Sequence, residues 1–314
     1  MKQLSAFLIR HAVWLAAIAI LVWAIVSVPE LGQPGYWALL SQSRFAIAAL
    51  ALALMPIMLT GGIDLSVGST TVLSSVAIGY CWHEIGWPIE AALAMGLLVG
   101  LFAGLVNGGL VTLGVMPLVA TLATRELFRG MALTLSGDTP VTLFPKVLRS
   151  VWRTPFLGLP LSVYLLGFLV LATFMVVHHT RFGRMLFAIG DNETAARFAA
   201  LPVRRVRLAV YAWAGLIAGL CGAAVVMHFD SAKADYGQSL ELTAIACLIL
   251  GGQRITGGSG HVVAALMGIV SVIALQAYLQ QTAATWRDTI MGALLLVVAL
   301  GNEAARLNPA SRAA

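Results

Sequence analysis

The residues most often used for catalysis or metal binding are scattered along this sequence. His83 and Glu84 begin a motif typical of zinc proteases, but Trp87 occupies the position that the second histidine requires. The three cysteines and the other histidines have no spacing typical of a metal site. The sequence also has neither a nucleophile elbow nor a Gly-x-x-x-x-Gly-Lys phosphate loop. We therefore expect no catalytic residue, no bound metal or cofactor, and no ATP hydrolysis by this chain.

A carboxylate between two apolar segments is the next candidate for chemistry. Asp64 lies in a glycine-rich run from Gly61 to Ser69. At the centre of a membrane a carboxylate costs roughly 2.5 to 3.5 kcal/mol, so a carboxylate at such a position is usually functional. Asp64 and Ser66 could bond the backbone groups that the glycines leave free, or they could contact a solute on its way through the protein. The sequence leaves both interpretations open.

Further polar residues near this run could belong to a pathway for a polar solute. Their hydroxyl and amide groups could bond solute hydroxyls. With Asp64 and Ser66 included, the pathway candidates are Thr60, Asp64, Ser66, Ser69 and Asn107. Each of them could instead make a hydrogen bond between helices, worth about 0.6 kcal/mol.

The elements that must position these residues are strongly apolar. Of the 314 residues, 60% are hydrophobic and 10% are charged, whereas about 25% of the residues of a soluble domain are charged. We predict an all-α polytopic membrane protein, formed by a single domain over residues 1–314. About ten transmembrane helices are expected from the length of the apolar segments, at 12–28, 44–60, 68–82, 90–113, 115–136, 161–179, 207–229, 240–252, 262–281 and 288–303.

The basic residues predict how these spans are oriented. An even number of spans places both termini on one side, and Lys2, Arg10, Arg306 and Arg312 lie near the termini. Six arginines lie in the segment 181–207. Because cytoplasmic segments of membrane proteins are rich in Lys and Arg, we predict that both termini and this segment face the cytoplasm. This distribution is typical of a membrane protein surrounded by the lipid bilayer, and we expect no nucleic acid as a partner.

The loop 137–160 does not follow this rule, because it should face outward and yet contains Lys146, Arg149 and Arg153. These three residues fall on one face of a helix, and apolar residues fall on the other. The spacing predicts an amphipathic helix on the membrane surface. The alternative is a different topology in this region.

Two of the predicted spans, 68–82 and 240–252, are too short to cross a bilayer unaided. Each adjoins a glycine-rich break, Gly61 to Ser69 in the first case and Gly251 to Gly260 in the second. Non-helical backbone at membrane depth must be buried in protein or reached by water. The residues predicted to act as hinges or breaks are Gly61, Gly62, Gly68, Gly251, Gly252, Gly257 and Gly258.

The segment 181–207 contains a predicted short helix from Glu193 to Ala200, ended by Pro202. Asp191 or Asn192 could cap it. Its alanines, Ala195, Ala196 and Ala199, would present a smooth face to the groove of a partner. A plain, positively charged cytoplasmic loop is the alternative.

Charged residues also interrupt the span that begins near Val115. Glu126 is close enough along a helix to neutralise Arg129. The cluster of Arg125, Glu126 and Arg129 would not face lipid. Either the cluster lines the interior of the protein or the helix breaks near Thr124. The sequence does not decide between these two arrangements.

The run Gly61-Gly62-Ile63-Asp64-Leu65-Ser66-Val67-Gly68-Ser69 closely resembles the signature of the ribose-type sugar permeases, which are the transmembrane subunits of bacterial ABC importers. Further similar segments follow in the order of that family and cover nearly the whole chain. They are Met116 to Leu122, Arg181 to Arg184, Ala188 to Gly190, Glu241 to Ile245 and Gly257 to Gly260. The chain departs from the family pattern at two places. The coupling loop of the family usually closes on a Gly-Ile pair, whereas this chain has Ala200-Leu201-Pro202-Val203, and Thr243 stands where an Asp is common. These departures resemble the rhamnose and autoinducer-2 branches.

The resemblance implies a permease subunit, not an enzyme, that imports a sugar or similar polyhydroxylated solute. ATP and Mg would be bound by a partner ATPase, and the other partners would be a second permease copy, identical or not, and an extracytoplasmic solute-binding protein. Segment 181–207 would be the loop coupled to the ATPase, through Gly190, Asn192, Glu193, Ala195, Ala196 and Arg197. The alternative is an ion-coupled secondary transporter of a small polar solute, with Asp64 as its coupling site.

Overall fold

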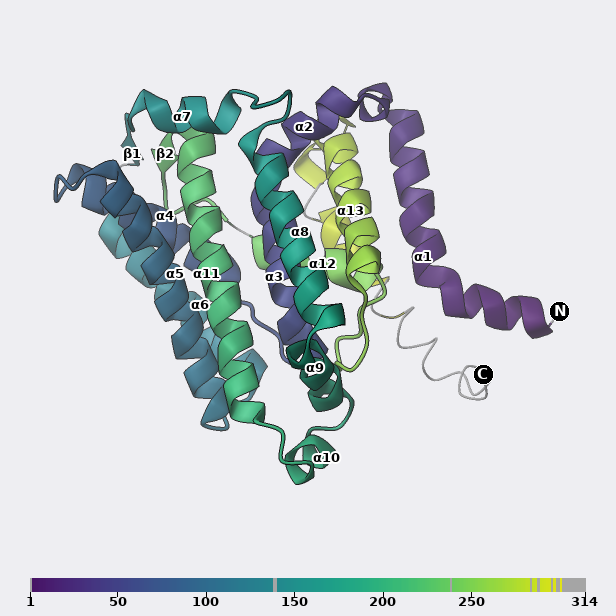
Figure 1. Ribbon diagram of the computed structural model, residues 1–314. Helices are drawn as coiled ribbons and strands as arrows, with labels where there is room; N and C mark the ends of the chain where they lie inside the picture. Colours follow the sequence, from purple (N-terminus) through teal and green to yellow (C-terminus); the bar gives the residue numbers. More distant parts are fainter. Residues whose placement is uncertain are drawn as a thin grey trace.

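The computed structural model is a bundle of helices with one pair of very short strands (Figure 1). It describes residues 2–137, 140–237, 239–282, 284–286, 289–294, 296–297 and 300, with side chains from Leu15 onward except that of Ala284. The elements in chain order are α1 Lys2–Ser27, η1 Pro29–Gly32, α2 Pro34–Ser43, α3 Phe45–Leu59, α4 Val67–His83, α5 Ile89–Thr112, α6 Pro117–Ser136, β1 Val141–Thr142, α7 Lys146–Arg153, α8 Leu161–His179, α9 Arg181–Asp191, α10 Glu193–Phe198, α11 Val203–Phe229, β2 Ser231–Ala232, α12 Leu240–Leu250, α13 Val262–Thr282 and η2 Ala284–Trp286.

The core is built around α3, whose residues from Ile47 to Leu59 are all buried. Helices α8, α11, α12 and α13 pack against it. A second close contact joins α5 to α11, where glycines face each other. A Cβ atom on Gly100 would lie 2.6 Å from the backbone nitrogen of Gly219, so the two helix backbones approach closely. Small residues are the usual means by which membrane helices pack in this way.

The predicted all-α membrane architecture is confirmed, but the number of ten crossings is not. Nine of the ten predicted ranges coincide with a described helix, and the tenth, 288–303, lies largely outside the described residues. Within the described part of the chain, α5, α8, α11 and α13 are long and apolar enough to span a membrane, and α2 with α3, bent by 73°, could form a fifth span. Helix α4 has 17 residues and α12 has 11, while α6 carries three charged residues near its middle.

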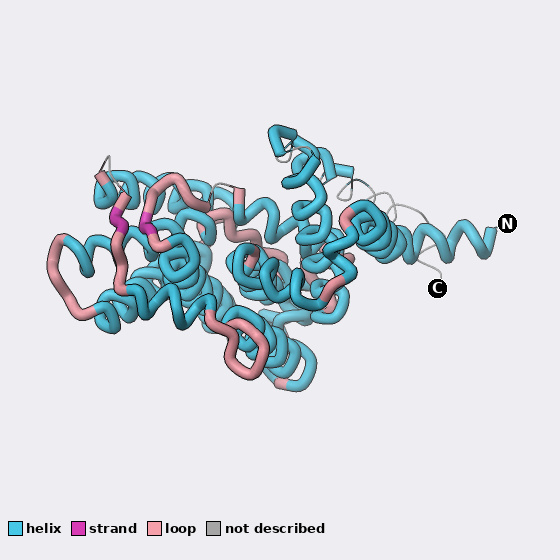
Figure 2. Tube along the Cα trace, turned by 90° about the horizontal axis from the view of Figure 1, so that it is seen from above, coloured by secondary structure: helices cyan, strands magenta, loops and turns pink. Residues whose placement is uncertain are grey.

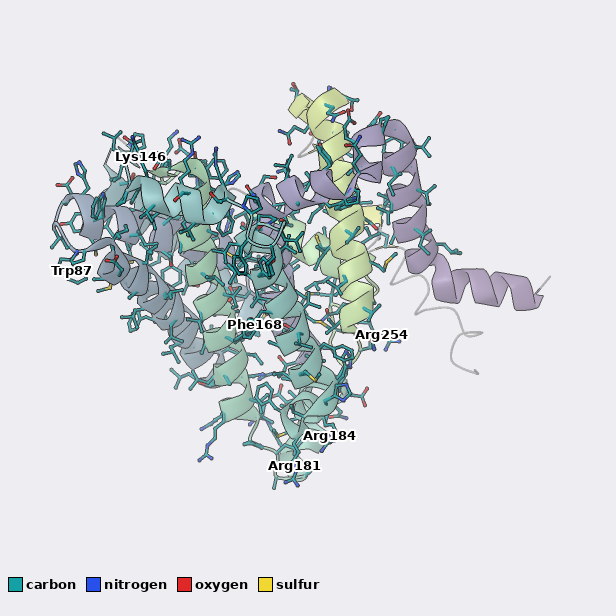
Figure 3. All side chains as sticks on the ribbon, turned by 45° about the horizontal axis from the view of Figure 1, so that its top comes forward. Trp87, Lys146, Phe168, Arg181, Arg184 and Arg254 are labelled. Carbon is teal, nitrogen blue, oxygen red and sulfur yellow. The ribbon has the colours of Figure 1, made fainter. Side chains whose placement is uncertain are left out.

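The bundle has two distinct ends. Helices α2 and α7 and both strands lie at one end, and α9 and α10 lie at the other (Figure 1). The basic side chains of Arg181 and Arg184 project at the α10 end, and Lys146 lies at the α7 end (Figure 3). Which end faces the cytoplasm stays a prediction, and Arg306 and Arg312 lie outside the described residues.

The predicted amphipathic helix in the loop 137–160 is α7. Its apolar side packs on the bundle through Leu148 and Trp152, which are both buried, and Trp152 meets Phe45 edge-on at a ring distance of 5.4 Å. Val147 and Val151 stay exposed. The sequence did not predict the strand pair beside α7, in which β1 and β2 run antiparallel (Figure 2).

Candidate functional site

The first glycine-rich break is held by a local turn around Asp64. Its Oδ1 accepts hydrogen bonds from the backbone N–H of Ser66 at 2.8 Å and from the Ser66 hydroxyl at 2.7 Å. Both residues are buried. An aspartate that bonds the backbone two residues later forms a turn, and here the turn directly precedes the first residue of α4. The geometry therefore matches the interpretation of Asp64 as a structural pin.

This turn is connected to α5 and α6 by two further side chains. The amide nitrogen of Asn107 donates to Ser66 Oγ, and the hydroxyl of Thr124 donates to Asn107 Oδ1, both at 2.6 Å. All four side chains are buried. We call this set, Asp64, Ser66, Asn107 and Thr124, the break network. It fixes the first break to two neighbouring helices.

The remaining pathway candidates also bond within the chain. The hydroxyl of Thr60 donates to the carbonyl of Ile57 at 2.7 Å, and the hydroxyl of Ser69 donates to the carbonyl of Ser66 at 2.8 Å. Both are buried. The polar groups of the predicted pathway thus have internal partners, and a contact between any of them and a solute stays a prediction.

The two glycine-rich breaks meet each other and the end of α9. The backbone N–H of Gly258 donates to the carbonyl of Leu59 at 3.0 Å. A Cβ on Gly257 would lie 2.6 Å from the nitrogen of Gly61, and a Cβ on Gly190 would overlap the carbonyl of Leu59. We call these five residues, Leu59, Gly61, Gly190, Gly257 and Gly258, the glycine junction. Only residues without a side chain allow three backbone segments to approach so closely.

The other predicted break glycines lie outside this junction. Gly62 faces the hydroxyl of Tyr211, which would lie 2.9 Å from an added Cβ. Gly68, in the first turn of α4, lies beneath the carboxylate of Glu241 at the start of α12, so an added Cβ would overlap it. Gly251 packs against Ala264 of α13, and Gly252 has a φ of +83°. The predicted hinges therefore fall into three groups: the junction, Gly62 beside Tyr211 of α11, and the glycines at the two ends of α12.

The segment 181–207 contains α9, α10 and the first residues of α11. Helix α10 corresponds to the predicted short helix, whereas α9 was not predicted. Asn192, and not Asp191, caps α10: its Oδ1 accepts from the backbone N–H of Ala195 at 3.0 Å. Ala195 is exposed, but Ala196 is buried against the chain itself. The large hydrophobic side chain of Phe198, in the same helix, is 88% exposed. Phe198 is not among the residues predicted to contact the ATPase, although an aromatic residue in a charged loop is a usable signal.

Glu193 ties α10 to α11. It accepts hydrogen bonds from Arg197 at 2.7 Å and from Arg207 at 2.5 Å. Burial alone would raise the pKa of Glu193, but the hydrogen bonds and charges of these two arginines hold it below its usual range. A lowered carboxylate pKa means that the attraction is present at neutral pH and is lost only as the pH falls through that pKa. Arg197 and Arg207 also line a cavity of about 360 Å³ beside the turn between α5 and α6.

Comparisons with known proteins identify the family. A family model described as "Branched-chain amino acid transport system / permease component" matches residues 37–299. The chain belongs to this permease family. It is similar to the autoinducer 2 import system permease proteins LsrD of three bacteria, and each match covers 84% of this chain and 82% of the relative. They are those of Yersinia enterocolitica (38% identical), Photorhabdus laumondii (36%) and Salmonella typhimurium (37%). No solved structure matches.

Membership in the permease family confirms the predicted resemblance, including its leaning toward the autoinducer-2 branch. This permease is a multi-pass membrane protein and a transport component, not an enzyme. The match extends over both glycine-rich breaks and the segment that contains α9 and α10. The roles of individual residues in the permease are not decided by the match, so they rest on the geometry described above.

Proposed function

We propose that this permease is the transmembrane subunit of an ATP-driven importer and that its solute is autoinducer 2 or a similar sugar-like, polyhydroxylated molecule. Two permease copies would enclose the solute pathway, an extracytoplasmic binding protein would deliver the solute, and a separate ATPase would bind ATP and Mg. The relatives named as autoinducer 2 import permeases support the solute class. The chain would lie in the bacterial inner membrane with both termini in the cytoplasm.

The glycine junction carries this proposal. It places the end of α9 in backbone contact with both breaks, so a displacement of α9 and α10 must move Leu59, Gly61 and Gly258 as well. Packed interfaces tend to switch between discrete arrangements instead of deforming continuously. An ATPase that shifts α10 would thereby rearrange the breaks that flank α4 and α12 and change access to the pathway.

An ion-coupled secondary transporter is the second candidate, because such proteins also have broken helices with a buried carboxylate. Asp64 would be the coupling site. The two hydrogen bonds from Ser66 to Oδ1 of Asp64 favour the role of a pin, since through them the carboxylate holds the turn that precedes α4.

The ATPase contact on α10 can be tested by copurification. Phe198→Asp introduces a charge at an apolar side chain that is 88% exposed and has no hydrogen-bonding role. We expect this variant to insert and unfold thermally like the wild type, but to lose most of the ATPase that copurifies with the tagged permease. The measurement is the ratio of ATPase to permease after affinity purification from solubilised membranes.

Leu143→Asp provides the matched control, since Leu143 is an equally exposed apolar residue (86%) at the α7 end. It should leave the ratio unchanged. Equal ATPase recovery with wild type and Phe198→Asp would contradict a docking role for α10.

A further inference from the structure

The outward side of α6 differs from the outward sides of the other long helices. The exposed middle residues of α5 and α8 are apolar: Phe102 is 68% exposed, and Phe168, labelled in Figure 3, is 65% exposed. The exposed side of α6 also has apolar residues, such as Leu122 and Leu127, but charged side chains lie among them. The side chain of Glu126 is 68% exposed and that of Arg125 is 32% exposed. The helix does not break near Thr124, one of the two arrangements left open by the sequence, because α6 is continuous from Pro117 to Ser136.

These charges lie at the middle of the helix and not at its ends. At 1.5 Å per residue, Arg125 lies about 12 Å from the first residue of α6, and Arg129 lies about 10 Å from the last. Charged side chains at the centre of a bilayer are costly and face a protein interior or a water-filled space. This side of α6 therefore does not face lipid.

A buried carboxylate from another helix joins these charges. Glu241, in the first turn of α12, is 2% exposed, and its Oε1 accepts a hydrogen bond from Arg125 Nε at 3.0 Å. Arg125 also pairs with Glu126, and the charge of Arg129 acts on Glu241. We call these four residues, Arg125, Glu126, Arg129 and Glu241, the α6 charged cluster. It contains both signs of charge, so it can donate and accept hydrogen bonds toward the same space.

A second polar feature lies beside α6, nearer to its α7 end. The described residues between β2 and the start of α12, 233–237 and 239, are not helical (Figure 1). Among them, Ala234 is buried in one cluster with Phe128 and Ala132 of α6. The neighbours of Ala234, Lys233 and Asp235, form an ion pair at 2.5 Å and are 45% and 60% exposed.

The shared burial of Ala234 with Phe128 and Ala132 sets the position of this non-helical segment along α6. Phe128 and Ala132 lie about 12 and 6 Å from the α7 end of α6, counted at 1.5 Å per residue. Non-helical backbone at membrane depth must be buried in protein or reached by water. The exposed Lys233 and Asp235 favour water. Charged side chains are therefore present both in this segment and in the α6 charged cluster.

We propose that the side of α6 that carries Arg125, Glu126 and Arg129, together with residues 231–237 and 239–241, is the wall of the solute pathway and faces a second permease copy across it. The α6 charged cluster would be the mid-membrane subsite for the hydroxyl groups of a polyhydroxylated solute. This inference rests on the proposed function, because it names the surface that the two permease copies share. The mixed charges fit such a solute, whose hydroxyls both donate and accept hydrogen bonds.

Cysteine labelling in membranes that contain the complete transporter tests this assignment. The variants are Glu126→Cys and Arg129→Cys, and Phe168→Cys is the control at a similar depth on α8. The probe is a charged, water-soluble methanethiosulfonate. Wild type supplies the background, since Cys81, Cys221 and Cys247 are all buried. We expect both α6 variants to react roughly tenfold faster than the control or more, because the charged probe is excluded from lipid.

Reaction of Glu126→Cys and Arg129→Cys at the slow rate of Phe168→Cys would overturn the assignment. Because labelling is measured directly, this result counts whether or not a variant still transports. ATP-dependent uptake of autoinducer 2 by the wild-type complex is measured in the same preparation. Slow labelling with intact uptake would refute the pathway wall alone, whereas absent uptake with fast labelling would refute the proposed function and leave a water-filled face on α6.

Discussion

Replacing Gly190 by alanine is expected to abolish ATP-dependent uptake. The added Cβ would overlap the carbonyl oxygen of Leu59 and lie 2.5 Å from the nitrogen of Gly258, and both of these are backbone atoms that cannot turn aside. Overpacking of this kind typically costs about 1–3 kcal/mol. Here it would also separate α9 from the two breaks. The measurement is the initial uptake rate together with the ATPase rate of the assembled complex.

Gly167→Ala is the matched control, because Gly167 is also helical but has no atom within 4 Å of an added Cβ. Alanine there should leave uptake unchanged, and the helix preference of alanine should stabilise α8 by up to about 1 kcal/mol. If Gly190→Ala folds and transports like Gly167→Ala, the glycine junction does not transmit motion from α9 to the breaks.

Two substitutions of Asp64 are expected to have opposite results. Asparagine keeps an oxygen that can accept both hydrogen bonds from Ser66, so Asp64→Asn should retain most of the uptake. Alanine removes the acceptor and leaves a buried N–H and a buried hydroxyl without their partner, at a cost of about 1–3 kcal/mol each. Asp64→Ala should therefore lose most of the uptake. Both variants are compared by uptake rate and by thermal unfolding in detergent.

The asparagine variant also separates the two proposed transport mechanisms. An ion-coupled carrier needs a titratable carboxylate at its coupling site, and Asn does not supply one. Complete loss of uptake in a well-folded Asp64→Asn protein would contradict the structural pin and support ion coupling. Glu90→Gln, at the exposed start of α5, controls for the general loss of a carboxylate.

The helices could be predicted from the sequence because each buries a long apolar segment, and nine of the ten ranges were found. The exceptions have different causes. Helix α2 begins at Pro34 and carries several polar residues, so its apolar signal is weak. The strands β1 and β2 have two residues each, and their paired residues lie 89 and 91 positions apart in the sequence, a contact that no local pattern predicts.

The site could be predicted only in part, for a similar reason. The turn at Asp64 involves neighbours in the sequence, and its hydrogen bonds were among the expected alternatives. Asn107 was expected as a polar residue, but its partner Ser66 lies 41 residues away and the sequence does not pair them. The burial of Ala196 differs from the expected outward face, because so short a helix must turn one side toward the chain that supports it.

The glycine junction was the least accessible feature. Each of its three segments contains glycine, and a family resemblance marks each of them, but only the folded chain brings Gly61, Gly190 and Gly257 together. Such close approaches between backbones depend on the positions of the helices. The sequence specifies those positions only through the packing of the whole bundle. The junction brings three separate motifs into backbone contact.

Uptake by proteoliposomes in the absence of ion gradients tests the central claim most directly. The permease is reconstituted with its ATPase, its binding protein and any second permease subunit, and accumulation of autoinducer 2 is measured with and without ATP on the ATPase side. We predict accumulation toward the ATPase side that requires ATP and is insensitive to proton and sodium ionophores. Accumulation that needs an imposed proton or sodium gradient and ignores ATP would contradict the account.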